Sequence, residues 1–211
     1  MKQLKIIFPL LWVSLCAVGQ LHENNTKVKK IGNAILLEYL GRTPAYDIGI
    51  QVEIDTTTGV RYEVTFEHGT SVLSHVAVFY KFSNPGQTIF YNFLTHKSFI
   101  NTPSASTNDG NLELIGQAVI GKYTCTHIQQ GKGNDYWMSP DVPGYMALVT
   151  ALKNVDPQQL SIPFSGTIFT YGGLVRMTVF DHDTDFVGEI DLQEATTGVY
   201  LKPGTFDVPS K

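Results

Sequence analysis

The densest set of possible metal ligands is the acidic run Asp-His-Asp-Thr-Asp at residues 181–185. Aspartates at alternate positions are typical of the start of a calcium-binding loop, where carboxylate oxygens coordinate the ion. Such a loop needs glycine at its sixth position for a sharp turn, and this chain has Phe186 there. The flanking segments are predicted strands instead of helices, so we interpret the run as a polar hairpin loop. Calcium binding stays open for its three aspartates, Asp181, Asp183 and Asp185.

A thiol and an imidazole form the second arrangement that could do chemistry. Cys125 and His127 are two residues apart, and on a strand such residues point the same way. A nucleophilic thiol also needs a third group to orient its base, and none is evident, so we interpret Cys125 as a buried thiol. The six histidines are scattered without an i, i+4 pair, so a zinc site would have to be assembled by the fold. Serine hydrolase, phosphate-loop and dinucleotide motifs are absent. We therefore expect a protein that is not an enzyme and has neither a metal site nor a cofactor.

The first 19 residues have the layout of a secretory signal peptide. Lys2 and Lys5 precede an apolar run at residues 6–18, which is too short to span a membrane. Ala17-Val18-Gly19 is a small-x-small site, which predicts cleavage before Gln20. We expect a signal peptide at residues 1–19, a poorly ordered leader at 20–32 and a single domain at 33–211. The protein is then periplasmic or secreted and does not span a membrane.

Charge and cysteine content narrow the class of protein further. The chain has 15 Lys and Arg against 19 Asp and Glu, and its formal charge of −4 becomes more negative when the signal is removed. This mild acidity argues against nucleic acid as the partner. Cys16 leaves with the signal, so Cys125 has no cysteine to pair with inside the chain. The fold must therefore be stabilised by its core without a disulfide.

Alternation of apolar and polar residues predicts strands along most of the chain. It is strictest at residues 48–54 and 60–66, which a five-residue loop ending in Gly59 joins into a hairpin. Residues 34–40 fit a strand or a short helix equally well. Further strands are predicted at residues 72–82, 88–94, 97–101, 112–118, 122–128, 174–181, 186–192 and 204–208, with another that ends at Trp137. So many strands joined by short loops indicate a mainly β protein with an antiparallel sheet.

One amphipathic helix is predicted among these strands. After Pro143, apolar side chains at Tyr145, Leu148, Val149 and Leu152 follow the i, i+3, i+4, i+7 pattern of a single helix face. An apolar stripe must be buried, so we expect the helix to pack in the concave side of the sheet. A cavity between helix and sheet would be the natural site for an apolar ligand.

Three segments carry a resemblance to a known family. They are IGKYTCTH at residues 120–127, YWMSPDVPG at 136–144 and TFDVP at 205–209. They resemble motifs of a family of exported proteins of unknown function, DUF4412, which is similar to the periplasmic lipoprotein carrier and receptor fold (LolA and LolB). The resemblance implies a strongly curved antiparallel sheet, or open half-barrel, with helices in its concavity. In the lipoprotein carriers that concavity takes up acyl chains, although those carriers have several helices and this chain has one.

We therefore expect a non-catalytic envelope protein that binds a hydrophobic or amphiphilic ligand, such as a lipid or a lipoprotein acyl chain, in a half-barrel cavity. The alternative is a structural or protein-binding module with a filled core that docks another envelope protein. The space between helix and sheet distinguishes the two hypotheses. The same residue types fill ordinary cores, which is the competing interpretation for each candidate. The candidate lining residues are Trp137, Met138, Tyr145, Met146, Val149, Phe164, Phe169 and Met177.

Overall fold

The structure is a computed structural model, and it describes residues 32–101, 112–131, 133–152, 168–181 and 184–209. The expected signal peptide and most of the expected leader lie outside these ranges, as does Phe164. The side chains of the acidic run at 181–185 also lie outside the description. Calcium binding by that run therefore stays untested.

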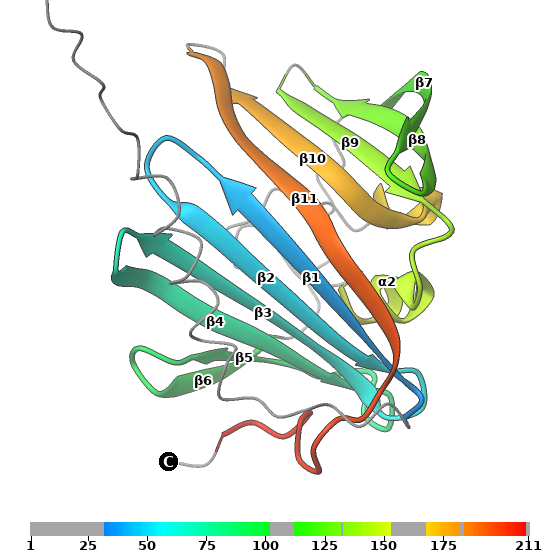
Figure 1. Cartoon of the computed structure of the whole chain (residues 1–211). Coiled ribbons are helices and arrows are strands. Elements are labelled where there is room, and N and C mark those ends of the chain that lie inside the picture. Colours follow the sequence, from blue (N-terminus) through cyan, green and yellow to red (C-terminus); the bar gives the residue numbers. More distant parts are fainter. Residues whose placement is uncertain (1–31, 102–111, 132, 153–167, 182–183, 210–211) are drawn as a thin grey trace, which may run out of the picture.

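Eleven strands in the described residues form one antiparallel sheet, in the order β6-β5-β4-β3-β2-β1-β11-β10-β9-β8-β7 (Figure 1). The edge strands β6 and β7 do not pair with each other, so the sheet stays open. The fold class is the expected one: mainly β, with a curved, open half-barrel. The strands are β1 (Ala34–Arg42), β2 (Asp47–Asp55), β3 (Gly59–His68), β4 (Ser71–Lys81), β5 (Thr88–Asn92), β6 (Lys97–Asn101), β7 (Leu112–Ile120), β8 (Tyr123–Gln130), β9 (Asn134–Ser139), β10 (Gly173–Asp181) and β11 (Thr184–Val199).

The predicted hairpin is confirmed as β2 and β3, which pair from Asp47–Glu67 to Asp55–Gly59. Alternate side chains of both strands are buried, as the period-two pattern requires. Residues 34–40, left between strand and helix by the sequence, are strand β1. The ladders have register shifts, including two between β1 and β11. Such bulges bend a strand and increase its twist, which contributes to the curvature of the sheet.

The helix α2 (Tyr145–Leu152) packs in the concave side of the sheet. Its buried residues are Leu148, Ala151 and Leu152. The predicted stripe is therefore right at both leucines, whereas Tyr145 and Val149 are only half-buried. One core cluster joins the inner face of the sheet to α2 and to the 3-10 helix η2 (Ile168–Tyr171).

A glycine corner places α2 against the sheet. Gly144, just before the helix, has φ +75°, and a Cβ there would lie 2.8 Å from Ile35 and 2.9 Å from Ile54. Positive φ and close approach both favour glycine at this position. The corner motif noted in the sequence therefore sets how closely the start of α2 approaches β1 and β2.

The strand predicted at residues 204–208 is wrong. Gly204 has φ +85°, and the Thr205 and Asp207 amides donate to the carbonyls of Lys202 and Gly204, which makes consecutive turns. The segment instead packs on a second cluster of buried residues, Ala77, Phe79 and Tyr91, through Val208. Turn hydrogen bonds and this packing outweigh the short apolar pattern that indicated a strand.

Candidate functional site

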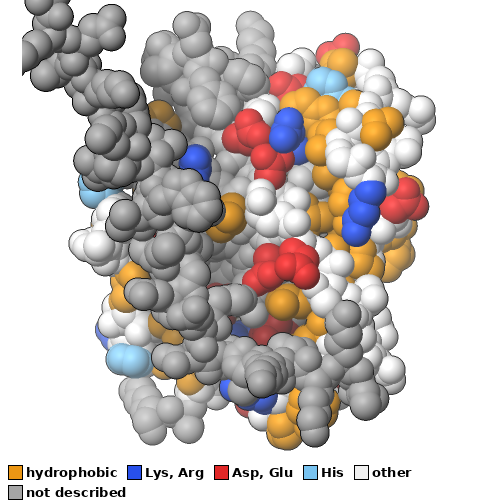
Figure 2. All heavy atoms as spheres, viewed as in Figure 1, with side chains coloured by type: hydrophobic (Ala, Val, Ile, Leu, Met, Phe, Trp, Pro, Cys, Tyr) orange, Lys and Arg blue, Asp and Glu red, His pale blue; other side chains and the backbone are white. Residues whose placement is uncertain are grey.

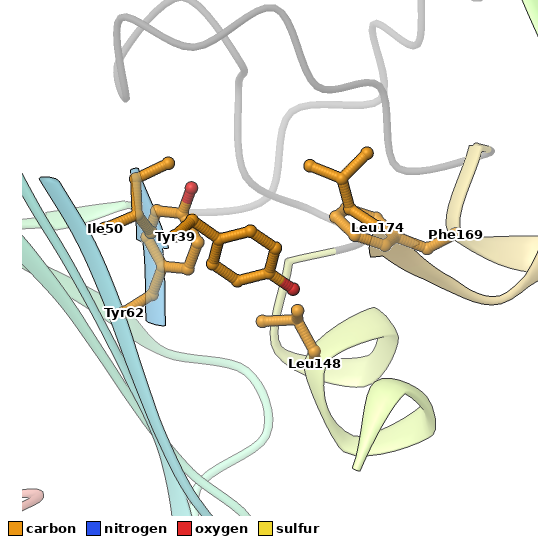
Figure 3. Close-up of a pocket in the computed structure, with 6 residues that line it drawn as sticks. All are labelled: Tyr39, Ile50, Tyr62, Leu148, Phe169 and Leu174. Atoms are coloured by element: carbon orange, nitrogen blue, oxygen red, sulfur yellow. The ribbon is translucent and has the colours of Figure 1, made fainter. Parts of the chain in front are cut away.

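A cavity lies between the inner face of the sheet and α2. Its walls come from three strands on one side and from α2, η2 and β10 on the other (Figure 3). Its volume, counted for the centres of water molecules, is about 10 Å³, roughly the room that one water needs. The cavity as it stands is thus far smaller than an acyl chain. The lining residues are Tyr39, Ile50, Tyr62, Leu148, Phe169 and Leu174.

Two tyrosines are the polar members of this apolar lining. The Tyr62 side chain is 2% exposed, and its hydroxyl is buried without a hydrogen-bond partner. A buried hydroxyl in this state costs about 1–3 kcal/mol relative to a satisfied one. Burial raises the pKa of Tyr62, and the neighbouring Tyr39 raises it further. Burial, followed by the proximity of Tyr123, likewise raises the pKa of Tyr39.

One of the eight residues that the sequence singled out, Phe169, lines this cavity. Met138 and Met177 are fully buried in the same core cluster, and Trp137 and Val149 are partly buried against it. Tyr145 is half-buried, whereas Met146 is 62% exposed. Of the eight predicted lining residues, the cavity thus contains Phe169, and ligand contacts by the other seven stay a prediction. Phe164 lies outside the described residues.

Five of the lining residues were not among the predicted candidates. Ile50 and Tyr62 belong to the inward rows that the alternation of β2 and β3 marks, and Leu148 belongs to the predicted helix stripe. The burial pattern was thus available from the sequence. Which buried residues meet across the sheet depends on contacts between distant segments, which periodicity does not report.

Cys125 and His127 make separate contacts. The Cys125 side chain is buried, and its thiol donates to the Tyr123 carbonyl at 3.7 Å. His127 Nε2 lies 2.9 Å from Asp135 Oδ1, and its ring stacks on Trp137 with the ring centroids 4.5 Å apart. Burial raises the pKa of the Cys125 thiol. No contact between the two residues appears in the described part of the chain.

A charged network occupies the outward face of β2–β4. Arg61 donates to Glu53 and also to Glu63, and His75 Nε2 lies 2.6 Å from Glu63 Oε1. Burial acts to raise the pKa of Glu63, but its hydrogen bond with His75 and the charge of Arg61 outweigh burial and lower the pKa. At Glu53 burial prevails, and the pKa is raised. These opposite shifts identify Glu63 as the carboxylate that the network stabilises.

The edge strand β7 exposes apolar side chains along its length. Leu114 is 60% exposed, Ile115 47% and Val119 75%. Figure 2 shows hydrophobic side chains gathered on the side of the molecule where β7–β9 lie. One edge of β7 has no neighbouring strand in the described sheet, so its backbone groups can accept another strand.

No group of three or more His, Cys, Asp and Glu side chains in the described residues is arranged to hold a metal ion. No helix in the same residues is long and apolar enough to cross a membrane.

The described residues thus define an open β half-barrel with a helix in its concave side. No family model and no curated protein sequence matches the chain, so membership of DUF4412 stays a prediction. The chain is similar to an uncharacterized conserved protein from Thermus thermophilus, at 9% identity and TM-score 0.48, over 94% of each chain. It is also similar to a putative outer membrane lipoprotein-sorting protein domain from Vibrio parahaemolyticus, at 9% identity and TM-score 0.35, over 90% of this chain and 94% of the other. A third similar structure is a DUF1329 family protein from Desulfovibrio piger, at 7% identity and TM-score 0.31, over 91% of this chain and 95% of the other. At these TM-scores the similarities assign neither a family nor a function.

Proposed function

We propose that this protein binds a long-chain amphiphilic ligand between α2 and the inner face of the sheet, without catalysing a reaction. The observation that carries the proposal is the apolar cavity at this interface, into whose lining the buried and unpartnered Tyr62 hydroxyl is built. A core evolved only for packing gains nothing from such a hydroxyl. A site for a ligand with one polar atom does gain from it.

The size of the cavity determines how a ligand can enter. At about 10 Å³ it admits a single polar atom, so an alkyl tail requires α2 to move away from β3. Exposing Leu148 and Leu152 costs about 3–6 kcal/mol at the usual value for a buried leucine. Each methylene of a buried tail contributes about 0.8 kcal/mol, so a tail of roughly eight carbons offsets that cost. The proposal therefore requires a long-chain ligand and excludes short ones.

The expected signal peptide supports a location of this activity in the periplasm or outside the cell. The resemblance of the corner and strand motifs to the DUF4412 family, and through it to the lipoprotein carriers, supports the same assignment. A lipid or a lipoprotein acyl chain is the ligand that best combines a long tail with such a compartment.

A second candidate function is docking of another envelope protein, with the half-barrel core filled by its own side chains. The exposed apolar side chains on the unpaired edge strand β7 favour it. Addition of a partner strand to such an edge is a common mode of recognition. The two functions use different parts of the sheet, so experiments can separate them.

Gentle purification followed by native mass spectrometry tests the first proposal. We expect bound species that add the mass of a lipid, and saturable uptake of a fluorescent long-chain fatty acid or alcohol. Probes with tails of about four carbons should bind far more weakly, because their burial at best just offsets the cost of exposing the two leucines. A chain that is empty under lipid-replete conditions and takes up no probe would contradict the proposal. Recovery of a crosslinked partner on β7 would then favour the second candidate.

A further inference from the structure

We propose that the ligand of this cavity carries an uncharged oxygen acceptor, such as an alcohol or an ester carbonyl, which accepts a hydrogen bond from the Tyr62 hydroxyl. The inference rests on the proposed function, because it names the class of ligand that the same site selects. It concerns the polar end of the ligand, whereas the proposed function concerns the tail.

The Tyr62 hydroxyl is an unsatisfied hydrogen-bond donor. The Tyr62 side chain is 2% exposed, lines the cavity, and its hydroxyl has no partner. In Figure 3 the Tyr39 ring points from the sheet toward Leu148 on α2, and the Tyr62 ring lies beside it with its hydroxyl on the side of Ile50. The cavity volume of about 10 Å³ is right for one oxygen atom beside them. An acceptor at this position satisfies the hydroxyl and removes the penalty of leaving it unpaired.

The lining residues that the structure describes offer no countercharge. The six lining residues are aliphatic or aromatic, and their only polar side-chain atoms are the two tyrosine hydroxyls. An ionised carboxylate or phosphate brought here would lose its water without gaining a cation, which is very unfavourable. Burial and the nearby Tyr39 also raise the pKa of Tyr62, as expected where negative charge is poorly tolerated. The site therefore favours a neutral acceptor over an anionic headgroup.

A buried water is the competing occupant. Buried waters typically make about three hydrogen bonds, and the side chains of the described lining offer two hydroxyls. Water is therefore held weakly, and a ligand oxygen that brings its own buried tail displaces it. The proposal predicts that the preference for an oxygen-bearing ligand disappears with the Tyr62 hydroxyl.

The test compares three probes of equal chain length, 1-dodecanol, dodecane and dodecanoate, with the wild type and with Tyr62→Phe. Affinity is measured by displacement of a fluorescent long-chain alcohol at pH 8, where dodecanoate is ionised. We expect the wild type to prefer dodecanol, and Tyr62→Phe to weaken dodecanol binding by roughly 3- to 10-fold. Dodecane binding should stay the same in both proteins.

Tyr136→Phe is the matched control, because Tyr136 is equally buried in the same core but its hydroxyl donates to Gln130 at 3.1 Å. Its thermal midpoint should fall while dodecanol affinity is retained. Tyr62→Phe should have an unchanged or higher midpoint, since it loses an unpaired hydroxyl. Equal dodecanol affinity in wild type and Tyr62→Phe would overturn this inference, as would tightest binding of dodecanoate. If no probe binds the wild type, the proposed function itself fails.

Discussion

Tyr62 of β3 and Leu148 of α2 lie in the wall of the same cavity, one on the sheet and the other on the helix that covers it. This relationship couples the packing of the helix to access to the Tyr62 hydroxyl. Under the proposed function, a ligand tail that enters this cavity displaces the Leu148 side chain. The stability of the helix on the sheet would then contribute to the binding equilibrium.

Leu148→Ala should destabilise the protein by about 2–5 kcal/mol, because it enlarges a cavity that the fold cannot fully close. The measurement is the free energy of unfolding in urea, with circular dichroism as the probe of unfolding. Met146→Ala is the matched control on the same helix, since Met146 is 62% exposed. Its free energy of unfolding should change by less than about 0.5 kcal/mol. Equal effects of the two changes would contradict the docking of α2 described above.

Gly144→Ala should also destabilise the protein, by about 1–3 kcal/mol, because its φ of +75° strains any residue with a Cβ. The new methyl group would in addition press on Ile35 and Ile54. Gly49→Ala in β2 is the control, since its Cβ would meet nothing within 4 Å. We expect the control to be neutral or slightly stabilising in thermal unfolding. A neutral Gly144→Ala would show that the corner does not set the position of the helix.

Glu63→Gln should destabilise the protein by about 1–3 kcal/mol at neutral pH, because it removes the carboxylate that pairs with Arg61 and His75. The pKa of Glu63 is lowered from its ordinary value of 4.5 on folding. Its stabilising effect is therefore complete above about pH 4.5 and is lost as the pH falls through the folded pKa. The difference between wild type and variant should shrink over that window in unfolding experiments at several pH values.

Glu53→Gln provides the contrast, because the pKa of Glu53 is raised on folding. Burial disfavours the charged form of Glu53. Its contribution to the free energy of unfolding therefore falls as the pH rises through the pKa of the folded state. The variant should cost less stability at neutral pH than Glu63→Gln does. The opposite order would contradict the roles assigned within the network.

Cys125 should react slowly with a thiol reagent at pH 8 in the native protein and rapidly after denaturation. Its side chain is buried, and burial raises the pKa of its thiol, which lowers the fraction of reactive thiolate. The reaction is followed in a Cys16→Ser background, so that one cysteine is observed. Rapid native labelling would indicate an accessible thiol and reopen a chemical role for this residue.

Sequence reasoning succeeded where the pattern is local. Strict alternation identified β2 and β3 together with their hairpin, and the stripe through Leu148 and Leu152 identified the helix. It fell short where distant segments decide the structure. Strand β11 continues to Val199, well beyond the predicted residues 186–192, because its pairing with β1 supports residues that show no alternation.

In the candidate site, too, local patterns could be predicted from the sequence and contacts between distant segments could not. The inward position of Tyr62 follows from the alternation of its strand. That its hydroxyl lacks a partner, and that Phe169 lines the same cavity, depend on the packing of η2 and β10 against the sheet. No short-range pattern contains that information. The aromatic candidates chosen by type therefore included Phe169 and missed both tyrosines.

Photolabelling with a long-chain alcohol that carries a diazirine on its tail is the most direct test of ligand binding between α2 and the sheet. Labelled protein is digested, and the modified peptides are identified by mass spectrometry. We expect label on peptides from β1, β3 and α2, which contain Tyr39, Tyr62 and Leu148, and we expect excess dodecanol to abolish it. Label confined to β7, or label that excess dodecanol does not reduce, would contradict it.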